Sequence, residues 1–362
     1  MSAAARKESY DAVFVGAGII GLACAWRAAQ RGLDVLVLDR AEPGAGASGV
    51  AAGMLAPVTE ADFSERELLD LNLRGAARWP EFAAELEAAG GESIGYRACG
   101  ALVAATEVDD VGELKRLLEL QRGLGLEVEW AGPRELRALE PGLSPRVAGG
   151  IVASQDGRVD PRATLRALQT AFAAAGGELR RAEVTSIRLA GERVVGVDFD
   201  GGRIDAAEVV VAAGAHTALL DLPALAPAPP VRPVKGQILR LRGTGPLLER
   251  IVRTPRCYIV DRGDGRVVVG ATVEEQGFDE RVTADGVFRL LEAAREVLPE
   301  VAELELYELR AALRPGTPDN LPVIGRAEVE GLVWATGHYR NGVLLAPLTA
   351  DIVTTTLTGA AR

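Results

Sequence analysis

A G-x-G-x-x-G loop between a short apolar run and an alanine-rich stretch constrains the fold of this chain more than any other feature. The apolar run, residues 10–15, is long enough for one buried parallel strand. The loop spans residues 16–21, residues 22–30 have a helical composition, and a second apolar run, residues 35–38, ends at Asp39. This order predicts a strand–helix–strand unit that binds a dinucleotide, with the pyrophosphate at the N-terminus of the helix.

The glycines and the acid of this unit each have a physical task. Gly16 allows the tight turn, Gly18 lets the backbone approach the pyrophosphate, and Gly21 lets the helix pack on the strand. Asp39 stands at the tip of the second strand, where its carboxylate can accept both hydroxyls of an adenosine ribose. The alternative, a glycine-rich turn in some other α/β protein, explains less of this spacing. The unit by itself does not distinguish NAD from FAD.

Composition and charge exclude several classes of function. The formal net charge of −11 argues against nucleic acids and anionic membranes as partners, because both require a basic face. The chain has two histidines and three cysteines, and Cys24, Cys99 and Cys257 lie far apart without metal-binding spacing. We therefore predict no metal site and expect small buried cysteines in a reducing compartment. The N-terminal stretch lacks the apolar run of a signal peptide, and no run approaches the ~20 residues that span a bilayer, which favours a cytoplasmic protein.

The order of the remaining segments predicts two interleaved domains, for which 362 residues are sufficient. Residues 43–57 have almost no bulky side chains before Met54, so we expect this segment to lie along the cofactor. Residues 65–78 and 79–89 each have a helical pattern, and the proline-rich residues 223–233 are typical of a linker. Alternating strands follow in residues 237–270, with a hairpin signal at Asp264-Gly265.

We predict an α/β fold in which a Rossmann-like domain with a central parallel sheet is interleaved with a substrate domain. The substrate domain is expected to have a mainly antiparallel β-sheet with flanking helices. The dinucleotide domain is assigned residues 8–90, 145–222 and 315–362, and the substrate domain residues 91–144 and 223–314. A final helix after residue 342 favours FAD over NAD, because its N-terminal dipole would return to the place where a reduced flavin gathers negative charge.

Five stretches of the chain resemble the D-amino-acid-oxidase-like family of FAD-dependent oxidoreductases. They are GAGIIG at residues 16–21, ASGVAAGMLAP at 47–57, CYIVDR at 257–262, LRPGTPDNLPVIG at 313–325 and GHYRNGVLLAP at 337–347. AAGMLAP and GHYRNG point to the glycine-oxidase branch of thiamine biosynthesis within that family. One residue departs from the family pattern, since Asp261 stands where proline is expected.

The resemblance implies oxidative deamination of glycine and other small amines or amino acids, such as sarcosine and small D-amino acids. The substrate would give its α-hydrogen as hydride to flavin N5, and the imine would be hydrolysed to a 2-oxo acid and ammonia while O2 becomes H2O2. The resemblance also implies a homotetramer and a possible transfer of the glycine imine to thiazole synthase. It leaves open which of these substrates is preferred and whether the electron acceptor is O2.

The resemblance assigns roles to particular residues. Arg314 would hold the substrate carboxylate with its two-pronged guanidinium, Tyr258 would donate its hydroxyl to the same carboxylate, and Arg340 and Met54 would complete the substrate site. Without the resemblance, Arg314 could equally end a strand in a surface ion pair, and Tyr258 and Met54 would more often be core residues. His338 is assigned no proton transfer. The residues expected to contact FAD are Gly16, Gly18, Ile19, Ile20, Gly21, Asp39, Arg40, Ala47, Ser48, Ala52, Gly53, Met54, Val184, Gly214, His338, Tyr339, Arg340, Asn341, Gly342, Val343 and Leu344.

Three alternatives are kept. A sarcosine-type or D-amino-acid oxidase or dehydrogenase of the same family is the first, although covalent FAD would require a cysteine near the C-terminal loop. The last cysteine is Cys257, so we predict non-covalent FAD. An FAD-dependent tRNA-modifying oxidase shares the fold, but it would need a basic groove that an acidic chain is not expected to have. A flavin-binding sensor without catalysis is the third alternative.

Overall fold

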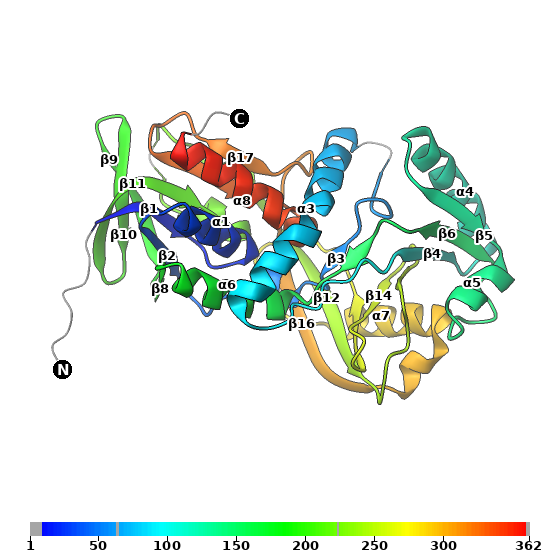
Figure 1. The fold of residues 1–362 in the computed structure, drawn as a ribbon. Helices are drawn as coiled ribbons and strands as arrows, with labels where there is room; N and C mark the ends of the chain where they lie inside the picture. The colour runs from blue at the N-terminus through cyan, green and yellow to red at the C-terminus, as the bar shows by residue number, and fades with distance from the viewer. Residues whose placement is uncertain (1–8, 63–64, 223, 360–362) are drawn as a thin grey trace.

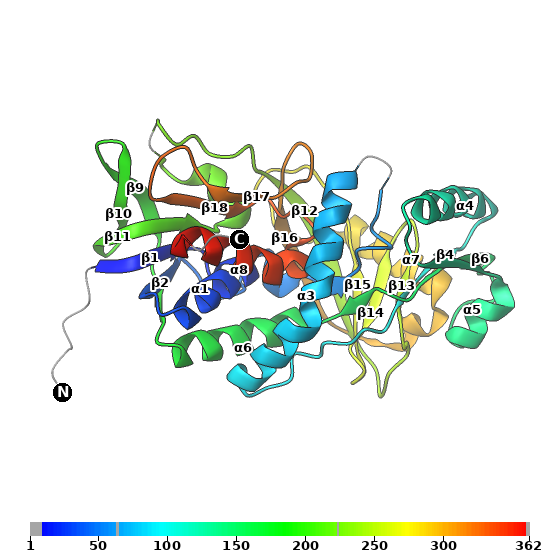
Figure 2. The same cartoon turned by 45° about the horizontal axis from the view of Figure 1, so that its top comes forward.

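The computed structural model describes residues 9–62, 65–222 and 224–359. Figure 1 shows two groups of strands at opposite ends of the molecule, with helix α3 (Arg66–Gly90) between them. The same division is visible after rotation in Figure 2. Each group is an eight-stranded sheet.

The first sheet is built around the strand–helix–strand unit. Its parallel strands lie in the order β18-β11-β1-β2-β8, and β17 extends the sheet antiparallel to β18. An antiparallel hairpin, β9–β10, continues from β11. The sheet confirms the predicted parallel Rossmann-like arrangement. The strands are β1 (Ser9–Val15), β2 (Val35–Asp39), β8 (Glu178–Arg181), β9 (Val184–Ala190), β10 (Arg193–Phe199), β11 (Gly202–Val211), β17 (Val323–Arg326) and β18 (Leu332–Thr336).

Three helices lie on one face of this sheet, and α3 packs across two of them. α1 (Ile19–Gln30), α3, α6 (Pro161–Ala174) and α8 (Gly342–Thr358) share a core that includes Trp26, Trp79 and Phe172. α1 is almost wholly buried because its alanines allow close packing. α6 begins at Pro161, whose missing N–H costs nothing at that position, and the preceding Asp160 accepts hydrogen bonds from two backbone N–H groups of the first turn.

α3 is one helix where the sequence pattern suggested two. It runs through Pro80, which has no N–H to donate to the preceding turn. The helix continues because residues on both sides of the proline are buried against its neighbours: Trp79 is 0% exposed and Phe82 is 2% exposed. The Trp79 indole N–H also donates to the carbonyl of Leu344 in α8, at 3.0 Å.

The second sheet is antiparallel except where β13 pairs in parallel with β4. Its order is β16-β12-β15-β14-β13-β4-β6-β5, and the long pair β12–β16 forms the edge nearest the first sheet. These strands are β4 (Ala101–Ala105), β5 (Val128–Ala131), β6 (Gly149–Ala153), β12 (Arg232–Arg242), β13 (Ile251–Arg253), β14 (Tyr258–Asp261), β15 (Arg266–Gly270) and β16 (Glu305–Gly316). The flanking helices are α4 (Val108–Gly123), α5 (Pro133–Leu139) and α7 (Ala284–Val297).

One proposed domain boundary differs from the arrangement of the sheets. Strand β6 lies in the second sheet, where it pairs with β4 and β5, although the boundary at residue 145 assigned it to the dinucleotide domain. The chain crosses between the sheets just after β6, at the short pair β3 (Met54–Leu55) and β7 (Gly157–Arg158). Within the described residues, no helix has both the length and the hydropathy needed to cross a bilayer.

Candidate functional site

A cavity of about 740 Å³ lies between the two sheets. On one side it meets the carboxyl ends of the parallel strands β1, β2 and β11, and on the other it meets β12, β14, β15 and β16. In parallel sheets, ligands bind at the carboxyl ends of the strands. The cavity is therefore the candidate site.

Most residues expected to contact the cofactor line this cavity. Three do not: Gly21, Asn341 and Leu344. Gly21 sits where α1 crosses β1, and a Cβ there would be 1.9 Å from the carbonyl oxygen of Gly16. Asn341 is buried at the N-terminus of α8, and Leu344 belongs to the helical core. The expected residues that line the cavity are Gly16, Gly18, Ile19, Ile20, Asp39, Arg40, Ala47, Ser48, Ala52, Gly53, Met54, Val184, Gly214, His338, Tyr339, Arg340, Gly342 and Val343.

The glycine loop has an open face towards the cavity. A Cβ at Gly16, which has φ +113°, would lie 2.5 Å from the carbonyl oxygen of Ala212. A Cβ at Gly18 would meet only the Ser48 hydroxyl, at 3.2 Å. The same hydroxyl accepts a hydrogen bond from the N–H of Ile19 at 3.0 Å. At Gly16 and Gly18 the loop therefore presents backbone, without a side chain, to the cavity.

Asp39 has a second task that the sequence did not reveal. Its Oδ2 accepts a hydrogen bond from the N–H of Ala17 at 2.7 Å, and its Oδ1 accepts one from the N–H of Ala41 at 2.9 Å. The carboxylate thus ties the glycine loop to the end of β2. An ionised carboxylate has about four acceptor positions, so it can still receive the hydroxyls of a ribose.

His216 lines the same end of the cavity, although sequence reasoning gave it no role. Its Nε2 lies 2.7 Å from Nη2 of Arg40, and its ring lies at a centroid distance of 5.3 Å from that of Phe278, in the segment between β15 and α7. Burial, followed by the positive charge of Arg40, lowers the pKa of His216. The neutral ring can accept the Arg40 hydrogen bond. The available signal was its position in the short 3-10 helix Gly214–Leu219, a few residues beyond the end of β11.

Arg314 and Tyr258 both line the cavity from the second sheet. Arg314 projects from β16 and donates through Nη1 to the carbonyl oxygens of Thr272 at 3.1 Å and Lys235 at 3.3 Å. Within the described residues no carboxylate pairs with it, which excludes the surface ion pair. Tyr258 is on β14, and burial raises the pKa of its hydroxyl while the nearby charge of Arg314 lowers it.

Two glycines make room for these side chains. A Cβ at Gly236 would lie 2.2 Å from Nη1 of Arg314, and a Cβ at Gly270 would lie 2.3 Å from the hydroxyl oxygen of Tyr258. Gly236 is on β12 and Gly270 ends β15, so the second sheet has no side chains at these two positions. Neither glycine was recognised from the sequence.

Charged residues surround Arg340 at the edge of the cavity. Glu60 pairs with Arg253 at 3.0 Å and lies 3.8 Å from Nε of Arg340. Arg340 also pairs with Glu65 at 3.1 Å. Glu60 and Arg253 both line the cavity, and sequence reasoning missed them because their pairing joins segments 193 positions apart.

Asp261, which stands where the family pattern has proline, is explained by its local hydrogen bonds. Its Oδ2 accepts hydrogen bonds from the N–H groups of Leu247 at 2.6 Å and Leu248 at 3.3 Å, and its Oδ1 accepts one from Gly263 at 2.5 Å. The side chain is 2% exposed and does not line the cavity. Asp261 therefore orders neighbouring loops of the second sheet.

His338 is buried, with Nε2 2.9 Å from the hydroxyl of Thr349. Burial lowers its pKa to about 3, so the ring is neutral near pH 7. This state agrees with assigning it no proton transfer. Across the described residues, no three histidine, cysteine, aspartate or glutamate side chains cluster in a way that could hold a metal ion.

Comparisons with known proteins cover nearly the whole chain. Residues 11–356 match the DAO family, described as FAD dependent oxidoreductase. Glycine oxidase from Geobacillus kaustophilus (strain HTA426) is 37% identical over 95% of this chain and 92% of its own length. The bifunctional protein ThiO/ThiG of Trichormus variabilis is 36% identical over 95% of this chain, which spans 52% of that protein.

Two solved structures are similar to this chain over nearly its whole length. The crystal structure of glycine oxidase from Geobacillus kaustophilus has a TM-score of 0.92 at 35% identity, covering 98% of this chain and 96% of that one. The structure of iminodiacetate oxidase from Chelativorans sp. BNC1 has a TM-score of 0.86 at 30% identity, covering 97% and 96%.

Proposed function

Since the chain belongs to the DAO family of FAD-dependent oxidoreductases, we propose that it oxidises glycine and other small amines to the imine, with O2 as electron acceptor. The observation that carries the proposal is the pair Arg314 and Tyr258, which line the cavity from the second sheet while the dinucleotide loop lines it from the first. A guanidinium and a phenol are the donors that a small carboxylate needs. Relatives named glycine oxidase support the choice of substrate.

The residues around the cavity fit FAD. Gly18 caps α1 without a side chain, which leaves space for phosphates at a helix N-terminus. The segment from Ala47 to Met54 lines the cavity with small side chains, and α8 begins at Gly342 beside it. We propose that the lining residues named above hold the cofactor. We propose that Asp39 holds the ribose.

When bound, FAD supplies an acceptor for the hydride of the substrate. We propose that Arg314 offers two parallel N–H groups to the substrate carboxylate and that Tyr258, protonated near pH 7, adds a third donor. Together they would fix the α-carbon at one distance from the ring, which is the main contribution a protein can make to this transfer. Met54 and Arg340 would close the substrate end.

His338 and Glu60 line the cavity, but neither is free to act as a general base. His338 is neutral but its Nε2 already contacts Thr349, and Glu60 is paired with Arg253. We therefore propose that the substrate ammonium releases its proton to solvent water before the transfer, so that the neutral amine gives up the hydride. The N-terminal end of α8 would stabilise negative charge on the reduced ring.

We further propose a homotetramer that passes the glycine imine to a thiazole synthase. The ThiO/ThiG relatives, in which the matching region makes up about half of a bifunctional protein, support the second part of this proposal. A thiazole-forming assay with and without this enzyme tests the transfer, and light scattering measures the mass of the assembly.

A peroxide assay tests the activity. Glycine, sarcosine, N-ethylglycine, D-alanine, D-proline and the L-forms are compared at equal concentration. Peroxide from glycine and sarcosine is the expected result. A flavin that stays oxidised when mixed anaerobically with every amine would contradict the proposal and favour a flavin-binding sensor. Reduction without peroxide in air would indicate a dehydrogenase.

A further inference from the structure

The backbone of residues 49–53 lies between the cavity and a group of arginines. Val50, Ala51, Ala52 and Gly53 line the cavity. Three arginines from other segments of the chain donate hydrogen bonds to this backbone. Arg162 and Arg240 donate to the carbonyl oxygen of Gly49, at 2.9 and 3.0 Å. Arg262 donates to the carbonyl oxygen of Ala52, at 2.5 Å. None of these three arginines is among the residues that line the cavity.

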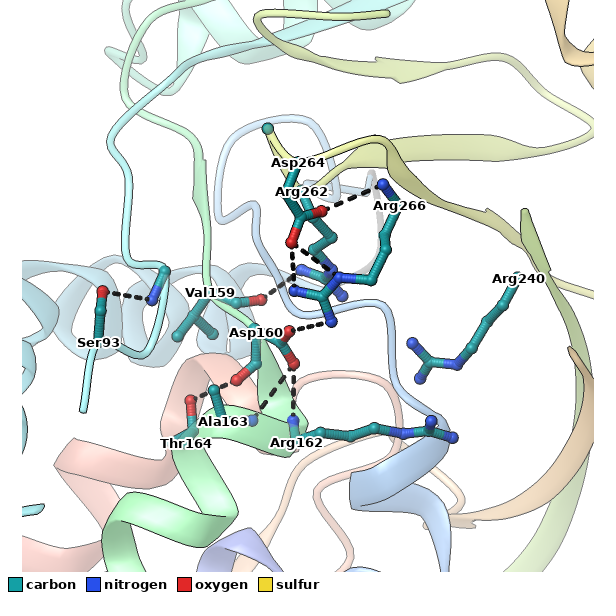
Figure 3. Close-up of polar contacts among 12 residues, drawn as sticks. Ser93, Val159, Asp160, Arg162, Ala163, Thr164, Arg240, Arg262, Asp264 and Arg266 are labelled. Atoms are coloured by element: carbon teal, nitrogen blue, oxygen red, sulfur yellow. Dashed lines mark hydrogen bonds and ion pairs between the residues drawn. The ribbon is translucent and has the colours of Figure 1, made fainter. Parts of the chain in front are cut away.

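Arg262 makes a second bond that fixes its position. Its Nη1 donates to the carbonyl oxygen of Val159 at 2.6 Å, and the N–H of Val159 donates to the carbonyl oxygen of Gly53 at 2.9 Å. Figure 3 shows Arg262 reaching Val159, with Asp160 and Arg266 beside it. The guanidinium therefore connects the loop after β14 with two strands of backbone near β3 and β7.

The direction of one peptide follows from these contacts. In a trans peptide the N–H points away from the C=O of the same unit. The carbonyl of Ala52 points to Arg262, which does not line the cavity, so the N–H of Gly53 points to the other side of the segment. Gly53 has φ +76°, and a Cβ there would lie 2.0 Å from the carbonyl oxygen of Val159. Only glycine fits this arrangement.

We propose that Arg262 is a positioning residue for the flavin: it orients the Ala52–Gly53 peptide so that its N–H faces the isoalloxazine ring, and its positive charge behind that peptide favours the reduced ring. A fixed N–H and a cation that need no rearrangement stabilise developing negative charge well. The inference rests on the FAD of this family and not on the amine that we propose as substrate.

Arg262 keeps its charge in this position. Burial lowers its pKa to about 10, and Asp160 opposes that change. Near pH 7.5 the guanidinium is therefore protonated. A charge surrounded by protein interacts more strongly with its neighbours than one in water. Removing it should make the bound flavin harder to reduce.

Arg266 provides a matched control. It lies on the same hairpin, pairs with Asp160 at 3.1 Å and with Asp264 at 2.8 Å, and leaves 40% of its side chain exposed. Both of these carboxylates lie outside residues 49–53. Arg266→Met therefore removes one nearby arginine without removing a contact to the cavity-lining segment.

The test compares Arg262→Met, Arg262→Lys and Arg266→Met as FAD-loaded proteins without substrate. The midpoint potential of the flavin and its dissociation constant are measured, and thermal melting verifies folding. In Arg262→Met the reduction equilibrium should be at least tenfold less favourable, which is about 30 mV for two electrons. FAD should also bind at least tenfold more weakly. Arg262→Lys should lie between this variant and the wild type, and Arg266→Met within about twofold of the wild type.

Wild-type potential and affinity in a folded Arg262→Met would overturn the proposal. Equal losses in Arg262→Met and Arg266→Met would also overturn it, because a general effect of charge would then suffice. If Arg262→Met does not fold, Arg262→Lys decides, since a lysine lacks the planar fork whose two nitrogens each reach one carbonyl oxygen. Unchanged flavin properties in Arg262→Lys would then refute the two-point contact. No amine is used, so failure here leaves the proposed amine oxidation to its own assay.

Discussion

The guanidinium of Arg314 lies against the backbone of Gly236, so closely that a Cβ at Gly236 would be 2.2 Å from Nη1. Gly236 is opposite Ala312 on β16, two positions before Arg314. The arginine can therefore reach the carbonyl oxygens of Thr272 and Lys235 while its remaining N–H groups stay available. The proposed carboxylate site depends on a missing side chain as much as on the arginine.

Replacing Gly236 should damage substrate binding before it damages the flavin site. In Gly236→Ala the added methyl forces the guanidinium away from its two carbonyl partners, so KM for glycine should rise and kcat/KM fall at least tenfold, about 1.4 kcal/mol. The flavin spectrum should stay normal. Gly123→Ala is the control, since a Cβ there meets nothing within 4 Å. An unchanged KM for glycine in Gly236→Ala would show that glycine binding does not depend on the close approach of Arg314 to Gly236.

Arg314→Lys keeps the positive charge but loses the two parallel N–H donors of the guanidinium. One charged hydrogen bond contributes about 1.5–3 kcal/mol, so kcat/KM for glycine should fall by roughly ten- to a hundredfold. Benzoate should perturb the flavin spectrum of the wild type and leave that of the variant unchanged. Arg310→Lys, on the exposed side of the same strand, is the matched control. Near-normal turnover in Arg314→Lys would argue against the bidentate carboxylate contact.

Asp39→Ala should weaken FAD binding and also destabilise the apoprotein. The structure adds the second effect, because the carboxylate accepts hydrogen bonds from the N–H groups of Ala17 and Ala41. Each lost bond to a charged group should cost about 1.5–3 kcal/mol. Urea unfolding of the apoprotein and FAD titration separate the two effects. Full flavin occupancy with unchanged affinity would show that Asp39 does not hold the ribose.

Much of the first sheet could be predicted from local sequence. The glycine loop, the alanine-rich helix and the apolar strands up to Asp39 lie within one short stretch, so their geometry depends on neighbours in the chain. The predicted boundary at residue 145 places β6 in the other domain, because Gly149–Ala153 is an apolar run that contains nothing to identify its partners, β4 and β5. Strand pairing of this kind is decided by tertiary contacts.

In the candidate site, too, some residues could be predicted from the sequence, whereas others depend on contacts between distant segments. Arg314 and Tyr258 were named through the family resemblance, and the structure brings both to the cavity. Gly236, Gly270, Glu60 and Arg253 were missed, because their importance lies in what faces them from distant segments. In the sequence, Arg262 stands out only as the last residue of CYIVDR. Its contact with Ala52 joins residues 210 positions apart, and no local pattern encodes it.

The flavin should be released by acid. Cys257 lines the cavity, but burial raises the pKa of its thiol to about 11, so it is protonated and a poor nucleophile near pH 7. Precipitation with trichloroacetic acid should therefore leave the yellow colour in the supernatant. Cys257→Ala should still bind FAD before precipitation and should likewise release it into the acid supernatant. Colour in the pellet of the wild type, lost in Cys257→Ala, would instead identify a covalent bond at this residue.

His338 should make the fold sensitive to mild acid. Burial lowers its pKa from 6.5 to about 3 in the folded chain, so the unfolded chain binds a proton that the folded chain excludes. The stabilisation is complete above pH 6.5 and is lost as the pH falls towards 3. At 1.36 kcal/mol per pH unit, the loss from this group should be roughly 2 kcal/mol at pH 5. Urea unfolding of the apoprotein at pH 7.5 and pH 5 measures this loss of stability.

The control is His338→Asn, which has no titratable ring and should lose less stability over this pH range than the wild type. Equal losses in the two proteins would show that the histidine is protonated in the folded state or that another group controls the acid response.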